Sequence, residues 1–284
     1  MGTIRRSYAI FVESLHILAK DKEILVFPFL SGIITIIAFV TMVFAGATSG
    51  LFREFQAGNR ALAYAVLFVW YFVSWFIVLF FNVAVIECAS IRLRGGDPTI
   101  ADGFRASMQH LGRIVVWALI SATVGVILRV IAERAKIIGR IISALLGAVW
   151  SIATYFIVPV MIFERRSIRD SVKQSTQLIV KTWGESLVAA AGIGAFIMLL
   201  AVGGLVLPIA AIFISPTAAL VALGVMVVYW IALSVISGAL SGIFRTALYL
   251  YATEGRTPPG FSPDYVQHAF VAKPGRKALA FETS

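Results

Sequence analysis

The sequence predicts an all-α polytopic membrane protein with six transmembrane helices. Of its 284 residues, 60% are hydrophobic and only 13% are charged, whereas soluble domains have about 25% charged residues. So few charges cannot cover the surface of a water-soluble globule of this length. Several charge-free stretches also reach the ~20 residues that a helix needs to cross the hydrocarbon core. The composition therefore excludes an ordinary soluble protein, a disordered chain and a disulfide scaffold.

Six spans account for the charge-free stretches. The stretch over residues 186–244 is too long for one helix, and the Ser-Pro-Thr sequence at 215–217 is typical of a tight turn between two spans. The third span reaches full length only when the Arg129 side chain extends toward the lipid headgroups. Pro159 and Pro208 are expected to kink or end the fourth and fifth spans. The expected helices cover residues 24–46, 61–86, 114–132, 141–163, 187–213 and 217–244.

The distribution of Lys and Arg predicts the orientation of these spans. The segments on the side of the two termini hold 18 of these residues, and the segments on the other side hold six. Because positive charge is retained in the cytoplasm, both termini are expected to be cytoplasmic, in a multi-pass protein of the inner (cytoplasmic) membrane. The net charge of +10 then indicates contact with anionic lipid headgroups. No soluble domain with clustered basic and aromatic residues points to nucleic-acid binding.

The polar segments between the spans contain a repeat. Thr99-x-x-Asp102-x-x-Arg105-x-Ser107-x-Gln109-x-x-x-Arg113 precedes the third span. It recurs at a constant offset of 68 residues as Ser167-x-x-Asp170-x-x-Lys173-x-Ser175-x-Gln177-x-x-x-Lys181 before the fifth span. A degenerate copy, Ser14-x-His16-x-x-x-Lys20, precedes the first span. A fixed period of this kind indicates an internal structural repeat.

Each copy is expected to form an amphipathic helix at the membrane interface. Thr99 with Asp102, like its counterpart pair in the second copy, resembles a capping box with Asp in place of Glu. Apolar and basic positions fall on opposite faces at helical spacing. The expected architecture is three units, 1–91, 92–163 and 164–254, each an interfacial helix plus a transmembrane hairpin, followed by a poorly ordered tail, 255–284. The residues expected at lipid headgroups are Lys20, Arg105, Arg113, Lys173 and Lys181.

Several short sequences carry a resemblance to a known family. They are FPFLSG from residue 27, RGGDPT from residue 94, WS at 150, WGE at 183 and ALYLY from residue 247. Over roughly residues 20 to 270 the chain resembles an uncharacterised family of six-helix prokaryotic integral membrane proteins, a domain of unknown function. It is more distantly similar to the membrane domain of some glycerophosphodiester phosphodiesterases. The resemblance implies fold and location, but no activity and no catalytic residues, because phosphodiesterase chemistry resides in a separate soluble domain.

The residues that usually carry catalysis or bind metals are sparse. His16, His110 and His268 lie one to a region with no second ligand at helical spacing, and Cys88 is the single cysteine. A metal site needs three or four convergent ligands, and no hydrolase, phosphate-binding or dinucleotide-binding motif is present. We therefore expect no enzyme activity, no metal and no cofactor.

Two features raise the possibility of a solute path. Arg129 is either a side chain that extends to the headgroups or an anion-attracting pore position. In the last span, serines and a terminal arginine share one face, which is explained either by close packing around Gly238-x-x-x-Gly242 or by a hydroxyl-lined path. Glu87 is expected to form an ion pair with Arg92 or Arg94. The candidate path residues are Arg129, Ser234, Ser237, Ser241 and Arg245.

Three functions remain open on these observations. The first is a channel or facilitative permease for a small solute, with anions as one candidate class, which the polar serines and basic helix ends favour. The second is a membrane scaffold whose interfacial helices organise lipids, partner membrane proteins or further copies of the chain. The third is a lipid-processing enzyme, for which the sequence offers no catalytic constellation.

Overall fold

The computed structural model describes residues 3–51, 54, 57–134, 136–164, 166–181, 185–255 and 259. It describes their side chains except those of residues 3–11, 136, 181 and 185–193. Within these ranges the ordered elements are helices, and no strand is present. The tail that was expected to be poorly ordered lies almost entirely outside the described residues.

Six helical segments are long and apolar enough to cross a membrane, as the sequence predicts. Helix α4 extends to Leu93 and α12 to Glu254, beyond the expected ends at residues 86 and 244. Ser215 caps the last helix by accepting a hydrogen bond from the Ala218 N–H at 3.1 Å, which confirms the predicted turn. The spans are α2 (Val26–Thr48, after the 3-10 turn η1, Lys22–Leu25), α4 (Arg60–Leu93), α6 (Leu111–Arg134), α7 (Lys136–Ala153) with α8 (Ile157–Phe163), α10 (Glu185–Gly203) with α11 (Val206–Ile212), and α12 (Pro216–Glu254).

The fourth and fifth spans are both interrupted shortly before a proline. Pro159 is the third residue of α8, and Pro208 is the third residue of α11. Proline lacks an N–H, and its ring clashes with the carbonyl four residues earlier. The helix is therefore disturbed at Tyr155 by Pro159 and at Gly204 by Pro208. The breaks at residues 154–156 and 204–205 confirm that these prolines divide their spans.

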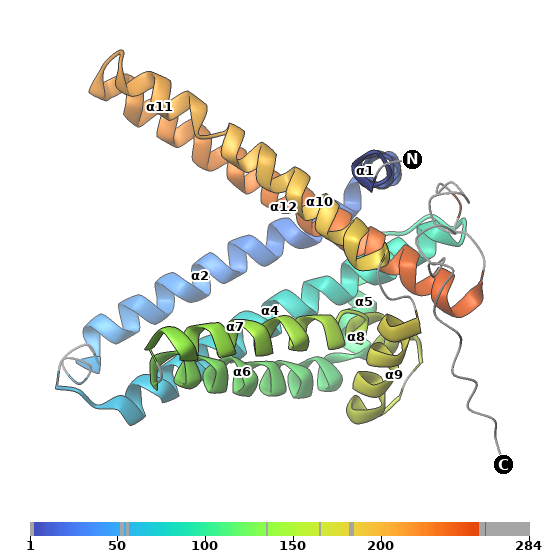
Figure 1. Ribbon diagram of the computed structural model, residues 1–284, viewed down its shortest axis with the longest axis horizontal. Coiled ribbons are helices and arrows are strands. Elements are labelled where there is room, and N and C mark those ends of the chain that lie inside the picture. Colours follow the sequence, from blue (N-terminus) through green and yellow to red (C-terminus); the bar gives the residue numbers. More distant parts are fainter. Residues whose placement is uncertain are drawn as a thin grey trace.

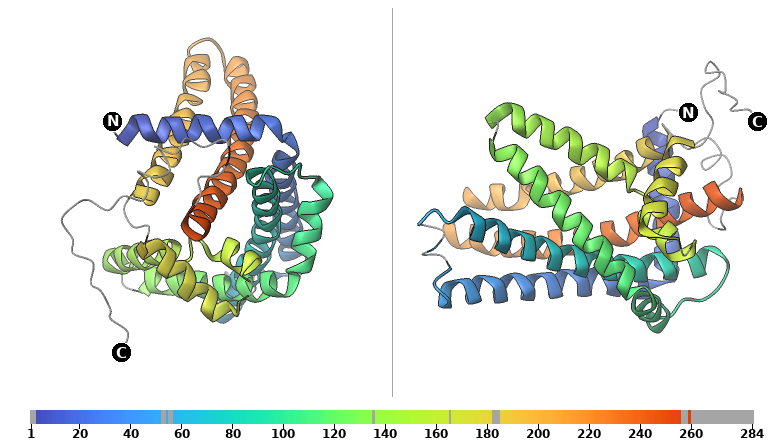
Figure 2. Two further views of the ribbon diagram at one scale, coloured as in Figure 1. Left: turned by 90° about the vertical axis from the view of Figure 1, so that its right-hand side faces the viewer. Right: turned by 90° about the horizontal axis from the view of Figure 1, so that it is seen from below.

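The bundle has two different ends (Figure 1). At one end lie the short helices α1 (Thr3–Lys20), α5 (Ile100–Gln109) and α9 (Ile168–Lys181) together with the C-terminal end of α12; we call this the amphipathic-helix end. The connections α2–α4, α6–α7 and α11–α12 lie at the opposite end, the hairpin end. Figure 2 shows the three short helices spread around the end of α12. Each precedes a transmembrane hairpin, in the order that the sequence predicts.

Small residues allow the helices to approach closely near the amphipathic-helix end. A Cβ atom on Gly242 of α12 would lie 2.3 Å from Val85 Cγ1 of α4, and one on Gly238 would lie 3.2 Å from Pro28 Cβ of α2. The Gly238-x-x-x-Gly242 pair therefore forms a packing surface against two other spans. The largest fully buried side chains, among them Phe27 and Phe156, also lie toward this end.

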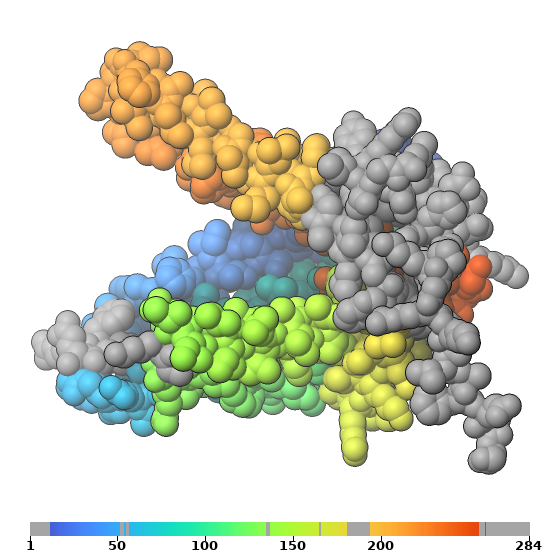
Figure 3. Space-filling view, viewed as in Figure 1, coloured from blue at the N-terminus to red at the C-terminus, as the bar shows by residue number. Residues whose placement is uncertain are grey.

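The third hairpin diverges from the other two toward the hairpin end. Figure 3 shows an open wedge between the α11–α12 arm and the arm that contains α2 and α7. The closed end of the wedge is a crevice of about 790 Å³ lined by residues of α2, α4 and α12, including Asn82 and Ser234. Large apolar side chains are exposed on both arms, such as Phe44 (69%) on α2 and Leu220 (70%) on α12.

Candidate functional site

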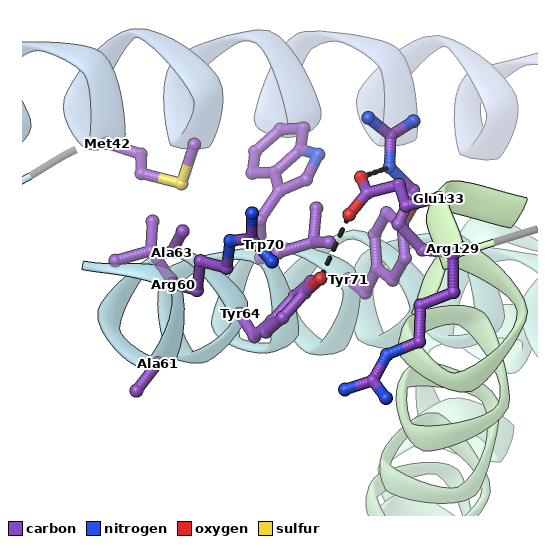
Figure 4. Close-up of a pocket in the computed structure, with 12 residues that line it drawn as sticks. Met42, Arg60, Ala61, Ala63, Tyr64, Trp70, Tyr71, Arg129 and Glu133 are labelled. Atoms are coloured by element: carbon purple, nitrogen blue, oxygen red, sulfur yellow. Dashed lines mark hydrogen bonds and ion pairs between the residues drawn. The ribbon is translucent and has the colours of Figure 1, made fainter. Parts of the chain in front are cut away.

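A hollow of about 1240 Å³ opens at the hairpin end between α4 and α6. We call it the arginine pocket and define it by Arg60 and Tyr64 of α4 and by Arg129, Glu133 and Arg134 of α6 (Figure 4). Trp70 and Tyr71 lie further along α4, and Met42 of α2 closes the other side. A neighbouring hollow of about 550 Å³ shares Arg129 and Glu133 and adds Arg140 of α7.

A hydrogen-bonded chain joins the two sides of the arginine pocket. The Arg129 Nε–H donates to Glu133 Oε1 at 2.5 Å, and the Tyr64 hydroxyl donates to Glu133 Oε2 at 3.0 Å. Glu133 follows Arg129 by one helical turn, so the arginine extends toward the end of α6, and its side chain is 57% exposed. The local sequence could have indicated this partner, since Arg and Glu four residues apart are neighbours on a helix.

The charge of the arginine pocket is unbalanced. Three arginines line it together with one carboxylate, and that carboxylate is already engaged by Arg129 and Tyr64. Within the described part of the chain, Arg60 and Arg134 form no ion pair, although Glu54 lies nearby, where its Oε2 accepts a 3.5 Å hydrogen bond from Asn59. The pocket is thus a positively charged hollow at one edge of the membrane-spanning region.

The other candidate path residues lie elsewhere, on α12. Ser234 is exposed and lines the crevice beside α2 and α4, whereas Ser237 and Ser241 are partly buried. The Arg245 guanidinium lies 5.0 Å from the centre of the Tyr155 ring at the α7–α8 break, a favourable cation–π contact. The structure therefore separates Arg129, between α4 and α6, from the polar stripe of α12.

The amphipathic helices attach to the spans through buried serines. The Ser107 hydroxyl of α5 donates to the Phe80 carbonyl of α4 at 2.7 Å. Ser175 occupies the matching position of α9; its hydroxyl donates to the Ala153 carbonyl at 2.7 Å and accepts from the Phe156 N–H at 3.1 Å. Ser14, the third equivalent in the sequence, is also fully buried, but its hydroxyl has no hydrogen-bond partner within the described residues.

The face of α5 that contacts the spans differs from the apolar stripe in its sequence. Gly103, Ala106 and Ser107 are buried, and a Cβ atom on Gly103 would lie 2.4 Å from the Phe27 ring. Small residues are needed because the helix lies directly against aromatic rings. Met108, an apolar residue of the same helix, is 60% exposed. The predicted capping box at Thr99 and Asp102 is confirmed in full.

The basic residues expected at the headgroups have different surroundings. Lys20, Arg105 and Lys173 are exposed at the amphipathic-helix end. Arg113 is partly buried and donates a 2.8 Å hydrogen bond from Nη1 to the Met161 carbonyl near the end of α8. The Lys181 side chain lies outside the described residues. Arg113 therefore has a structural contact that its position in the repeat did not indicate.

Ion pairs at the amphipathic-helix end differ from those expected. Arg92 binds Asp21, which is only 2% exposed, through two guanidinium nitrogens, and it contacts Asp97 at 2.5 Å. Arg94 pairs with Glu254 at 2.9 Å. Within the described residues neither arginine forms a salt bridge with Glu87, although the charge of Arg94 acts on it. The carboxylates that reach the two arginines come from the segment before η1, from the loop before α5 and from the end of α12. Asp21 and Glu254 lie 71 and 160 residues from their arginines, so no local spacing signalled them, whereas Asp97 lies five residues after Arg92.

The described residues offer little for metal or nucleophilic chemistry. No group of three or more His, Cys, Asp or Glu side chains converges within them. Cys88 is buried and donates a weak hydrogen bond from Sγ to the Thr99 carbonyl at 3.5 Å. The described residues instead expose basic and large apolar side chains.

Comparison with known proteins identifies one family. A model described as a family of unknown function, DUF6159, matches residues 61–261. No curated protein and no solved structure matches the chain. The expected likeness to phosphodiesterase membrane domains therefore finds no support.

Proposed function

We propose, from the exposed faces of its short helices, a function for this chain, which belongs to the family of unknown function DUF6159. The chain acts as a non-catalytic membrane scaffold. Its amphipathic helices gather anionic lipids at the membrane surface, and its diverging spans accommodate partner membrane proteins or a second copy. This role requires surfaces rather than a reaction centre.

The observation that carries this proposal is the composition of the exposed faces of α5 and α9. On α5, the 68% exposed Arg105 side chain accompanies the 60% exposed Met108. On α9, the exposed Lys173 accompanies Val180, which is 63% exposed. Exposed basic and apolar side chains on a short helix beside membrane spans suit the interface, where the apolar groups enter the headgroup layer and the cations contact anionic lipids.

The scaffold is proposed to consist of three similar units, 1–91, 92–163 and 164–254. The equivalent serines Ser107 and Ser175 are both fully buried, and both donate to a carbonyl of a preceding span. In this arrangement the amphipathic-helix end faces the cytoplasm, where it meets anionic lipid headgroups of the inner (cytoplasmic) membrane, in keeping with the distribution of Lys and Arg.

The wedge beside α12 is the proposed place for a protein partner. The two arms that border it expose large apolar side chains, such as Phe44 on α2 and Leu220 on α12. Between helices in a membrane, close packing and interhelical hydrogen bonds drive association, and the crevice at the closed end offers Asn82 and Ser234 for such bonds.

The test of the scaffold measures lipid preference in reconstituted vesicles. Energy transfer from the tryptophans of the protein to dansyl-labelled phosphatidylglycerol is compared with transfer to dansyl-labelled phosphatidylcholine. The wild type is expected to favour phosphatidylglycerol, and the variant Arg105→Glu/Lys173→Glu is expected to lose much of that preference. The charge-conserving variant Arg105→Lys/Lys173→Arg is the matched control. An equal preference in the charge-reversed variant would contradict the proposal.

A second candidate is a channel or facilitative permease for a small anionic solute. The positive charge of the arginine pocket favours it, since a basic hollow concentrates anions. Flux of anions and small metabolites into proteoliposomes tests this function, with empty liposomes and the variants Arg129→Ala and Ser237→Leu as comparisons. Flux that either substitution abolishes in folded protein supports permeation. Absence of flux across the panel favours the scaffold.

A further inference from the structure

The arginine pocket changes character along its length. Arg60 is the first residue of α4, and Arg134 is the last residue of α6, so both lie at the rim. Trp70 lies ten residues further along α4, about 15 Å deeper at 1.5 Å per residue. The lining between them includes Ala63, Val66 and Leu67. The hollow is therefore basic at the membrane edge and apolar and aromatic toward the hydrocarbon.

We propose that the arginine pocket binds a phospholipid with an anionic headgroup, whose phosphate contacts the rim arginines and whose acyl chain lies along the apolar wall. Arginine matches phosphate oxygens through paired N–H donors, and basic hollows between spans are suited to lipid headgroups. A free anion would use the rim alone, whereas a lipid uses both parts. The proposal concerns the hairpin end and does not depend on the scaffold role of α5 and α9.

Arg60 and Arg134 are the informative residues for a test. Neither forms an ion pair within the described residues, so replacing them removes positive charge without leaving a carboxylate unpaired. Glu133 keeps its bonds to Arg129 and Tyr64. Substituting Arg129 would disturb that chain and would confuse loss of binding with loss of structure.

The experiment measures binding of short-chain phosphatidylglycerol to the detergent-solubilised full chain by tryptophan fluorescence. Thermal midpoints of each variant establish that it is folded. We expect Arg60→Gln/Arg134→Gln to weaken binding about 30-fold, the loss expected for two arginines near a charged headgroup. Arg60→Lys/Arg134→Lys retains charge and is expected to bind with intermediate affinity. The control Arg105→Gln/Lys173→Gln, at the opposite end, is expected to bind like the wild type.

Two further probes identify the ligand class in the wild type. Phosphatidylcholine of the same chain length tests the charge requirement, and inorganic phosphate tests the need for an acyl chain. Binding of phosphatidylcholine as tight as that of phosphatidylglycerol would overturn the proposal, as would equally tight binding of inorganic phosphate. Unchanged phosphatidylglycerol affinity in Arg60→Gln/Arg134→Gln would also overturn it. If only Arg105→Gln/Lys173→Gln weakened the binding of phosphatidylglycerol, the pocket proposal would be refuted and the scaffold proposal would stand.

Discussion

The break between α7 and α8 makes Ser175 a critical residue for stability. At this break the Ile157 N–H donates to the Thr154 carbonyl, and the Tyr155 N–H donates to the Ile152 carbonyl. The Ala153 carbonyl and the Phe156 N–H thereby lose their usual helical partners. The Ser175 hydroxyl serves both groups, as donor to one at 2.7 Å and acceptor from the other at 3.1 Å.

The variant Ser175→Ala removes both hydrogen bonds at a fully buried position. An unsatisfied buried polar group costs about 1–3 kcal/mol. The Phe156 N–H loses its acceptor, whereas the Ala153 carbonyl keeps a long contact of 3.4 Å from the Thr176 hydroxyl. We therefore expect the free energy of unfolding to fall by about 2–4 kcal/mol, near the sum of one full and one partial penalty.

Ser171 provides the matched control on the same helix. It is also fully buried, but its hydroxyl oxygen has no hydrogen-bond partner within the described residues. Ser171→Ala removes the same atoms without orphaning a backbone group, so its effect is expected to stay within about 0.5 kcal/mol of zero or to stabilise. The contrast between the two variants isolates the hydrogen bonds of Ser175 from the loss of a hydroxyl in general.

The single cysteine provides the assay. Cys88 is only 1% exposed, so a thiol-reactive fluorescent dye labels it after unfolding. Thermal midpoints from dye labelling rank the variants in detergent, and titration with sodium dodecyl sulfate gives their free energies. Equal stabilities of Ser175→Ala and Ser171→Ala would refute the reasoning, because the break would then be stable without the hydroxyl.

Three further predictions concern helix packing, a helix break and a cap. Gly242→Ala forces a methyl group against Val85 and should cost about 1–3 kcal/mol in the same assay. Trp230→Phe removes the 3.0 Å hydrogen bond to the Ala201 carbonyl at the α10–α11 break and should lower the free energy of unfolding by about 1 kcal/mol. The Thr99 hydroxyl and N–H lower the pKa of Asp102, so its stabilisation is present above the unfolded pKa of about 3.9 and lost as pH falls through the folded pKa. Asp102→Asn should therefore flatten the acid side of the profile of thermal midpoint against pH.

Controls from the same chain keep these predictions specific. Gly224→Ala on α12 introduces a methyl group with nothing within 4 Å and should be neutral or slightly stabilising, so equal losses at both glycines would contradict the packing argument. Trp75→Phe is the control for Trp230→Phe, because Trp75 of α4 is similarly exposed (41%). An equal loss of unfolding free energy in the two variants would exclude the Trp230 hydrogen bond as the cause. A steep acid transition in Asp102→Asn would assign the pH dependence to other groups.

Local features of this protein could be predicted from its sequence. Charge-free stretches define the spans because the hydrocarbon core excludes charge whatever the tertiary arrangement. Pro159 and Pro208 divide their spans because the missing N–H and the ring act within one turn. The capping box of Thr99 and Asp102 also lies within one turn. Each of these signals depends on neighbours in the chain, so the sequence contains the whole interaction.

Contacts between distant segments were decided by the tertiary structure. The sequence identified Ser175 as a repeated position, but its role follows from the place where α9 meets the α7–α8 break. Proximity in the sequence pairs Glu87 with Arg92 or Arg94, whereas the fold brings Asp21 from before the first span to Arg92. The sequence groups Arg129 with the serines of α12 as candidates for one path, but the fold places them in separate regions. Residue type and spacing specify what a side chain can bind, and the crossing of helices determines which partner reaches it.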